Sequence, residues 1–213
     1  MLKSAEVRWL LNKGQEKQIE HWFATYDQQF GLEDNYPRYD YYLSLPDIDS
    51  LGIKIRDPRE MKEGLVSHVE IKKQIEENKT FKFNEHIEGQ LNTWIKYSIK
   101  LVDAPLIVEI LNSGNATTGW IPVAKDRLIL KYDLNTRKLV SATTFVDEGC
   151  GIELTRFKLK EKSIYTFGFE AFSKSDQEKR NLFRTLPLIF ESVGKIELNK
   201  KNSKSYPEIL QQY

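Results

Sequence analysis

The chain has 213 residues, of which 32 are Lys or Arg and 31 are Asp or Glu, so its net charge is +1. This balance excludes a strong overall field toward nucleic acid or an anionic membrane, so any preference for anions must arise from local arrangement. A single cysteine, Cys150, excludes an internal disulfide, and no apolar stretch approaches the ~20 residues of a membrane-spanning helix. We therefore expect one domain over residues 1–213, located in the cytoplasm, with the segment 175–213 packed on its main body.

In the first half of the chain, runs of β-forming residues predict strands at four places: residues 4–11, 35–45, 51–56 and 65–74. Between the first two strands, bulky apolar residues recur at helical spacing from Ile19 to Phe30, which predicts a helix with one aromatic face on the sheet. The charged segment 57–64 predicts the turn of a hairpin. Apolar residues at helical spacing predict a second helix over 86–101.

In the second half, a β-rich run begins at Pro105 and is followed by a predicted hairpin turn over 112–119. Four more strands are predicted, at residues 121–132, 138–147, 151–160 and 163–172. A capping-box pattern at 175–178 predicts the start of a third helix, which Pro187 is expected to kink or interrupt. The Lys- and Asn-rich segment 195–205 is expected to be exposed and to lead to a short docked tail.

Four segments carry charged residues two positions apart on a strand-like background. Successive side chains of a strand point to opposite faces, so the two charges of each pair share one face. The pairs are Glu6/Arg8, Lys54/Arg56, Glu70/Lys72 and Lys125/Arg127. Because most of the intervening positions are apolar and need cover, the pattern predicts an α+β fold. This fold is a closed antiparallel barrel of eight or nine strands, with a charged interior and about three helices outside.

A charged barrel interior must neutralise itself or bind a ligand. The predicted inward cations are Arg8, Lys54, Arg56, Lys72, Lys125 and Arg127. The predicted inward acids are Glu6, Glu70, Glu153 and Glu170. The excess of cations fits a polyphosphate, whose oxygens accept charge-assisted hydrogen bonds from several directions. The carboxylates would suit Mg²⁺ or Mn²⁺, which take oxygen ligands and bridge carboxylates to phosphates.

Short motifs follow one another in a defined order along residues 4–172. They are Ala5-Glu6-Val7-Arg8, Asp40-Tyr41-Tyr42, Gly52-Ile53-Lys54-Ile55-Arg56, Glu70-Ile71-Lys72, Lys125-Asp126-Arg127, Glu153 and Glu170. This order resembles the CYTH, or triphosphate tunnel metalloenzyme, superfamily. The resemblance implies an eight-stranded antiparallel tunnel that binds triphosphate compounds with divalent metal. The superfamily includes thiamine triphosphatases, tripolyphosphatases, RNA triphosphatases and some adenylyl cyclases.

The resemblance also implies roles for individual residues. Glu6, Glu153 and Glu170 become candidate metal ligands, and five cations match phosphate-binding positions, namely Lys54, Arg56, Lys72, Lys125 and Arg127; Arg8 is a further phosphate-binding candidate. The first strand departs from the family pattern Glu-x-Glu-x-Lys, because Arg8 replaces the second acid and Leu10 replaces the lysine. We therefore expect Arg8 to replace part of the positive charge that a metal ion would otherwise provide. Ordinary metal-dependent hydrolysis is disfavoured.

Three hypotheses about function follow. The favoured one is a barrel that binds a small polyphosphorylated molecule and that, if it is an enzyme, is a metal-dependent triphosphatase-like phosphohydrolase. The second is a noncatalytic barrel whose interior charges only neutralise one another. The third, nucleic-acid binding, draws on four tryptophans as stacking groups, and the near-zero net charge makes it the least favoured. The sequence does not predict an oligomeric state.

Overall fold

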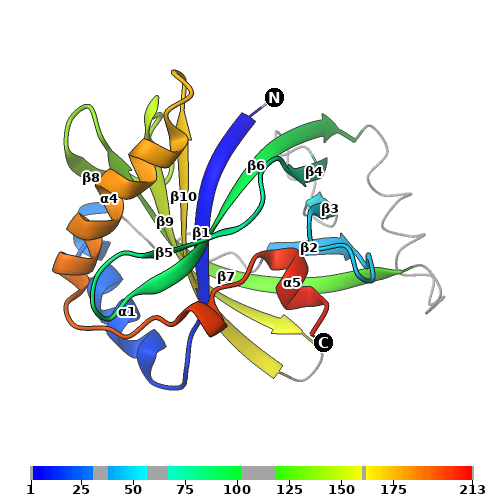
Figure 1. Ribbon diagram of the computed structural model, residues 1–213, viewed down its shortest axis with the longest axis horizontal. Coiled ribbons are helices and arrows are strands. Elements are labelled where there is room, and N and C mark those ends of the chain that lie inside the picture. The colour runs from blue at the N-terminus through cyan, green and yellow to red at the C-terminus, as the bar shows by residue number, and fades with distance from the viewer. Residues whose placement is uncertain (1, 31–37, 57–66, 102–118, 160–161, 213) are drawn as a thin grey trace.

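The computed structural model describes residues 2–30, 38–56, 67–101, 119–159 and 162–212. The barrel strands within these ranges are β1 (Leu2–Leu10), β2 (Arg38–Leu43), β3 (Leu51–Arg56), β4 (His68–Gln74), β6 (Glu88–Lys100), β7 (Trp120–Asp133), β9 (Glu148–Leu159) and β10 (Lys162–Ser173). Around the barrel their order is β1, β10, β9, β7, β2, β3, β4 and β6, and the pairing of β6 with β1 closes the ring (Figure 1). The predicted antiparallel tunnel of the α+β class is confirmed.

Two short strands lie outside the closed ring. They are β5 (Lys79–Lys82), which pairs with β6, and β8 (Lys138–Ser141), which pairs with β7. The sequence analysis missed the first of these and extended the second to residue 147.

The described residues form four α-helices and one 3₁₀ helix: α1 (Gln15–Ala24), α2 (Asp27–Phe30), α4 (Glu178–Val193), α5 (Tyr206–Leu210) and η1 (Lys200–Asn202). The predicted first helix is therefore interrupted around Thr25. Pro187 lies inside α4, which continues past it. The predicted capping box at 175–178 is wrong, because Gln177 precedes the helix and Ser175 instead donates to Glu148 at 3.0 Å.

A large apolar core lies outside the barrel, where α1 and α4 pack against β1, β9 and β10 (Figure 1). Trp9 and Phe169 point outward from neighbouring strands and form an edge-to-face contact, with ring centroids 6.4 Å apart. Phe190 of α4 packs on both rings, and Leu182 and Leu186 are fully buried. Burial of each such side chain contributes about 1.5–3 kcal/mol, so the helices hold the barrel from its outer surface.

The predicted helix over 86–101 is wrong, because most of this segment forms strand β6. Its apolar residues fit both periods. Leu91, Trp94 and Ile95 have helical spacing, whereas Leu91, Ile95, Tyr97 and Ile99 all lie at odd-numbered positions, as on one face of a strand. The strand pairings with β1 and β4 decide in favour of the alternating pattern. The side chains of β6 that line the barrel interior are Asn92, Trp94 and Lys96.

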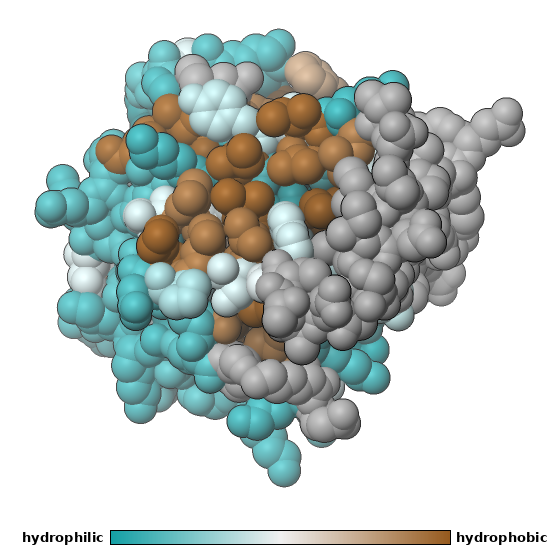
Figure 2. All heavy atoms as spheres, turned by 90° about the vertical axis from the view of Figure 1, so that its right-hand side faces the viewer, coloured by the Kyte–Doolittle hydropathy of each residue, from teal (hydrophilic) through white to brown (hydrophobic). Residues whose placement is uncertain are grey.

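The outer surface of β3, β4 and β6 is also apolar. Ile53, Ile71 and Tyr97 are neighbours across these strands, and Ile99 is 55% exposed. Figure 2 looks onto this side of the molecule and shows apolar atoms gathered there. The barrel is therefore apolar outside and charged inside, as the sequence predicts.

The predicted exposure of 195–205 holds for only part of this segment, because Ile196, Leu198, Ser203 and Ser205 are buried while the lysines at 195, 200 and 201 are exposed. Ser203 is 1% exposed and lies beside β1 and β6, where its hydroxyl accepts from the backbone N–H of Gln90 at 2.8 Å. Ser205 and Glu208 then form a capping box that starts α5. Ile209 of α5 closes an apolar cluster at one end of the barrel interior; its strand members include Tyr42, Val123, Phe157, Leu159 and Ile164.

Some predictions fall on other parts of the chain. The turn over 57–64, the β-rich run from Pro105 and most of the turn over 112–119 lie outside the described residues. Among the helices of the described ranges, none has the length and apolarity needed to cross a membrane. The assignment of the whole chain to one domain stays a prediction.

Candidate polyanion-binding cavity

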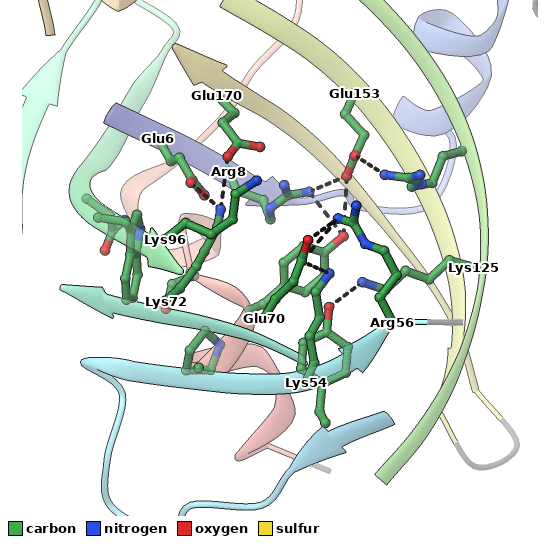
Figure 3. Close-up of a pocket in the computed structure, with 18 of the residues that line it drawn as sticks. Glu6, Arg8, Lys54, Arg56, Glu70, Lys72, Lys96, Lys125, Glu153 and Glu170 are labelled. Carbon is green, nitrogen blue, oxygen red and sulfur yellow. Dashed lines mark hydrogen bonds and ion pairs between the residues drawn. The ribbon is translucent and has the colours of Figure 1, made fainter. Parts of the chain in front are cut away.

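One cavity inside the barrel brings together all ten site residues that the sequence predicts (Figure 3). All eight barrel strands contribute side chains to its lining, and the C-terminal segment adds Tyr206. The alternation of side chains along each strand explains this convergence, because every other residue of a barrel strand faces inward. The charged pairs therefore point toward one another from segments far apart in sequence.

Positive charge exceeds negative charge in this cavity. Eight cationic side chains and four glutamates line it, and one further acid, Asp40, is fully buried beneath the cations. The cations are Arg8, Arg38, Lys54, Arg56, Lys72, Lys96, Lys125 and Arg127. The formal excess is three positive charges when Asp40 is included, which is one more than the predicted set of residues implied.

Asp40 anchors three of the cations. Its carboxylate accepts from Arg38 Nε at 2.9 Å and lies 3.1 Å from Lys54 Nζ and 3.2 Å from Lys125 Nζ. Burial alone would raise the pKa of Asp40, but Lys54, Lys125 and Arg38 hold that pKa well below its ordinary value. Asp40 is therefore ionised and fixes these cations along the cavity wall.

Two of these anchored cations are lysines with lowered pKa values. Burial, together with Lys125, Arg38 and Arg56, lowers the pKa of Lys54 to about 7 despite its contact with Asp40. Burial and the neighbouring arginines also lower the pKa of Lys125 to about 8. The ammonium forms of both lysines are therefore stabilised less than they would be in water, and an added anion would favour them.

Glu70 connects the third strand to the fourth. It lies 3.1 Å from Lys54 Nζ and 2.9 Å from Arg56 Nη2. The Nε–H of Arg56 is buried and has no acceptor among the described residues. A buried donor without a partner costs free energy, so this group provides an unused hydrogen bond at the cavity wall.

Lys72 lies between two glutamates that face each other across strands β1 and β10. Its Nζ is 2.5 Å from Glu6 and 3.0 Å from Glu170. Burial opposes charge on Lys72, but Glu170 and Glu6 raise the pKa of this lysine above its ordinary value. The ammonium group thus occupies the space between the two carboxylates.

Arg8 and Arg127 share the remaining glutamate. Glu153 accepts from Arg8 Nη1 at 3.1 Å, from Arg127 Nη1 at 3.2 Å and from the Thr155 hydroxyl at 2.6 Å. Burial would raise the pKa of Glu153, but the two guanidinium groups lower it far below its ordinary value. The carboxylate is therefore committed to these cations.

Sequence reasoning assigned no role to four residues of the site, for different reasons: Arg38, Asp40, Lys96 and Tyr206. Arg38 stands two positions before Asp40, which is the spacing used to find the other charged pairs, so a signal for Arg38 and Asp40 was present. Lys96 was missed because its segment was assigned to a helix. Tyr206 had no local signal, since it reaches the cavity only through docking of the C-terminal segment.

The donor set does not fit a divalent metal. Glu6 and Glu170 surround an ammonium group, and Glu153 lies between two guanidinium groups. No cluster of three or more His, Cys, Asp or Glu side chains suited to a metal ion occurs within the described ranges. Mg²⁺ and Mn²⁺ favour several oxygen ligands, so binding would first have to displace a protein cation. The metal role of these glutamates stays a prediction that the geometry does not favour.

Comparisons with known proteins support the fold. No family profile and no curated protein sequence matches the chain. Among solved structures, the Hippeastrum protein HpAC1, described as having a dominant triphosphatase activity, shows 9% identity and a TM-score of 0.50, over 100% of this chain and 96% of its own. The S. pombe RNA triphosphatase Pct1, solved with the Spt5 CTD, shows 11% identity and a TM-score of 0.50, over 90% and 83%. The chain therefore shares the closed antiparallel barrel fold of these two proteins, with a widely divergent sequence.

Proposed function

We propose that the barrel binds a small polyphosphorylated anion in its cavity. The observation that carries the proposal is the formal excess of three positive charges, counted with every lysine protonated, around one cavity built by residues from every barrel strand. Removing several charges from bulk water costs several kcal/mol per ion, and small barrels are ordinarily filled by apolar side chains. A chain that maintains such an interior is best explained by a ligand that completes it.

Phosphate oxygens are suited to the hydrogen-bond donors of the cavity cations. Each carboxylate that contacts a cation can be replaced by a phosphate oxygen, which accepts the same charge-assisted hydrogen bond. The unused Nε–H of Arg56 offers one more donor without any rearrangement of partners. The ligand class is therefore a compact anion with several oxygens and about three or more negative charges.

The alternative of a self-neutralising barrel predicts equal numbers of opposite charges. Five carboxylates contact the cations in the described part of the cavity, and eight cations face them. The imbalance favours ligand binding over self-neutralisation. Hydrolysis of the bound anion is a separate prediction, supported by the triphosphatase activity described for proteins of the same fold.

The proposal is tested by thermal unfolding and calorimetric titration of the full chain with pyrophosphate, tripolyphosphate, nucleoside triphosphates and thiamine triphosphate. A ligand at about 100 times its Kd stabilises the folded state by about 2.7 kcal/mol. We expect the larger polyphosphates to raise Tm, and phosphate release from each ligand that binds then tests hydrolysis. An unchanged Tm with every ligand would favour the self-neutralising barrel.

A matched pair of variants tests whether the anion binds inside the barrel. Arg56→Ala removes a cavity cation, and Arg156→Ala removes an arginine that bonds to Asp126 and Tyr165 on the outer surface. Hydrogen bonds to charged groups contribute about 1.5–3 kcal/mol, so Arg56→Ala should weaken binding about ten- to a hundredfold. Arg156→Ala should leave it unchanged, and equal losses in both variants would contradict the proposed location.

A further inference from the structure

Two of the chain's own cations contact three of the cavity glutamates. Lys72 bridges Glu6 and Glu170, and Arg8 contacts Glu153 from the opposite side to Arg127. Figure 3 shows these side chains directed toward one another from β1, β4, β9 and β10. A divalent ion would need the same carboxylate oxygens that these cations already use.

The position of Arg8 is specified by several contacts. The residue is 8% exposed, its Nη1 donates to Thr166 at 3.1 Å, and its guanidinium lies 4.2 Å from the Tyr206 ring centroid. The strand behind it carries Gly168, where an added Cβ would lie 2.8 Å from Arg8 Cζ. The Thr166 hydroxyl, the Tyr206 ring and the space left by the absent side chain of Gly168 thus form a close-fitting site for the Arg8 guanidinium, called here the Arg8 seat.

Charge disfavours a metal in the same place. A divalent ion would add two positive charges to a cavity that already has a formal excess of three. The glutamates that would attract it are held by arginine and lysine at hydrogen-bond distance. Arginine and lysine need fewer oxygen partners than Mg²⁺ or Mn²⁺, so the few carboxylates of the cavity suit them better than a metal ion.

We propose that the cavity binds its polyanion without a divalent metal, because Arg8 and Lys72 already hold the carboxylate oxygens of Glu153, Glu6 and Glu170 that a bridging metal would need. This inference rests on the proposed function and narrows its ligand class to the free polyanion rather than its Mg²⁺ complex. When the polyanion binds, its oxygens replace glutamate oxygens around Arg8 and Lys72. The glutamates hold these cations in place until then.

The first test is calorimetric titration of the full chain with tripolyphosphate, once with EDTA and once with excess Mg²⁺. We expect binding in EDTA, with Mg²⁺ weakening it because the metal complexes the ligand. Binding at least tenfold tighter with Mg²⁺, a difference of 1.4 kcal/mol, would overturn the inference and leave the proposed function standing. An absence of binding under both conditions would overturn the proposed function together with the inference.

The second test uses Mn²⁺ alone, detected by its paramagnetic signal, and therefore needs no activity. Arg8→Glu replaces the seated cation by a carboxylate close to Glu153 and Glu6, which should create a Mn²⁺ site that the wild-type chain lacks. Arg156→Glu makes the same change of charge on the outer surface and should create no such site.

Two outcomes decide this second test. Mn²⁺ bound by Arg8→Glu at least tenfold more tightly than by the wild type and by Arg156→Glu supports the inference. Mn²⁺ bound equally by the wild type and Arg8→Glu would overturn it. If Arg8→Glu does not fold, the titrations of wild-type chain with EDTA and Mg²⁺ decide alone.

Discussion

The molecule has two interiors of opposite character, one on each side of the same barrel wall. Outside the wall, Trp9 and Phe169 pack with the helices in an apolar core. Inside it, on the alternate positions of the same strands, Arg8 and Glu170 face a charged cavity. The difference indicates that stability and the proposed binding of an anion depend on opposite faces of the same strands, so each should be changeable while the other is retained.

The largest expected effect is on the outer core. Phe169→Ala removes a ring that contacts Trp9, Phe167 and Phe190, and such truncations cost about 3–5 kcal/mol. Urea denaturation should show this loss, whereas the tripolyphosphate affinity of the folded protein should stay unchanged. Phe183→Ala, at a residue that is 37% exposed, is the control and should cost much less. A large loss of affinity in Phe169→Ala would show that the two faces are not separable.

A change inside the cavity should move stability and affinity in opposite directions. Glu153→Gln leaves Arg8 and Arg127 without their carboxylate, which should lower the free energy of unfolding by about 1–3 kcal/mol. The same change adds one positive charge to the cavity and should tighten tripolyphosphate binding. Asp126→Asn alters the net charge equally on the outer surface and should leave affinity unchanged. Weaker binding by Glu153→Gln would mean that the carboxylate itself contacts the ligand.

Adding one methyl group at Gly168 tests whether the Arg8 seat is needed for anion binding. Gly168→Ala brings a Cβ within 2.8 Å of Arg8 Cζ, so the guanidinium must shift, at a cost in stability of about 1 kcal/mol and with weaker tripolyphosphate binding. Gly151→Ala is the matched control, because its Cβ would meet only the Glu170 carbonyl at 3.6 Å. Equal affinities in the two variants would exclude Arg8 from binding.

The last expected effect is a dependence of stability on pH. Between the lowered pKa values of Lys54 and Lys125, about 7 and 8, and the ordinary value of 10.5, the unfolded chain binds more protons than the folded chain. The free energy of unfolding without ligand should therefore rise with pH across this window, by up to about 1.4 kcal/mol per pH unit for each lysine, and the contribution of these lysines should be constant below it. Denaturation across the window should show a shallower slope for Lys54→Met, and an unchanged slope would exclude Lys54 as the titrating group.

Local alternation explains why much of the site was predictable. A charge two positions from another on an apolar strand has only two faces available, so the sequence alone places Glu6 and Arg8 together. The segment containing Trp94 satisfied both a helical and an alternating period, and only its pairing with β1 and β4 decided between them. Tyr206 depends on a docking event that no local pattern encodes. The ion pairs of Lys72 were equally inaccessible, because they require the register between strands.

The docked end of the chain limits how a long ligand can enter. Ile209 and Tyr206 cover one end of the barrel, and Phe157 and Val123 fill the space beneath them. In the part of the chain that the structure describes, this end of the barrel is filled, so we expect a linear polyphosphate not to pass through the ring here. If the proposed function holds, such a ligand would present a terminal group to the arginines and lysines, and any product would leave by the route through which the ligand came.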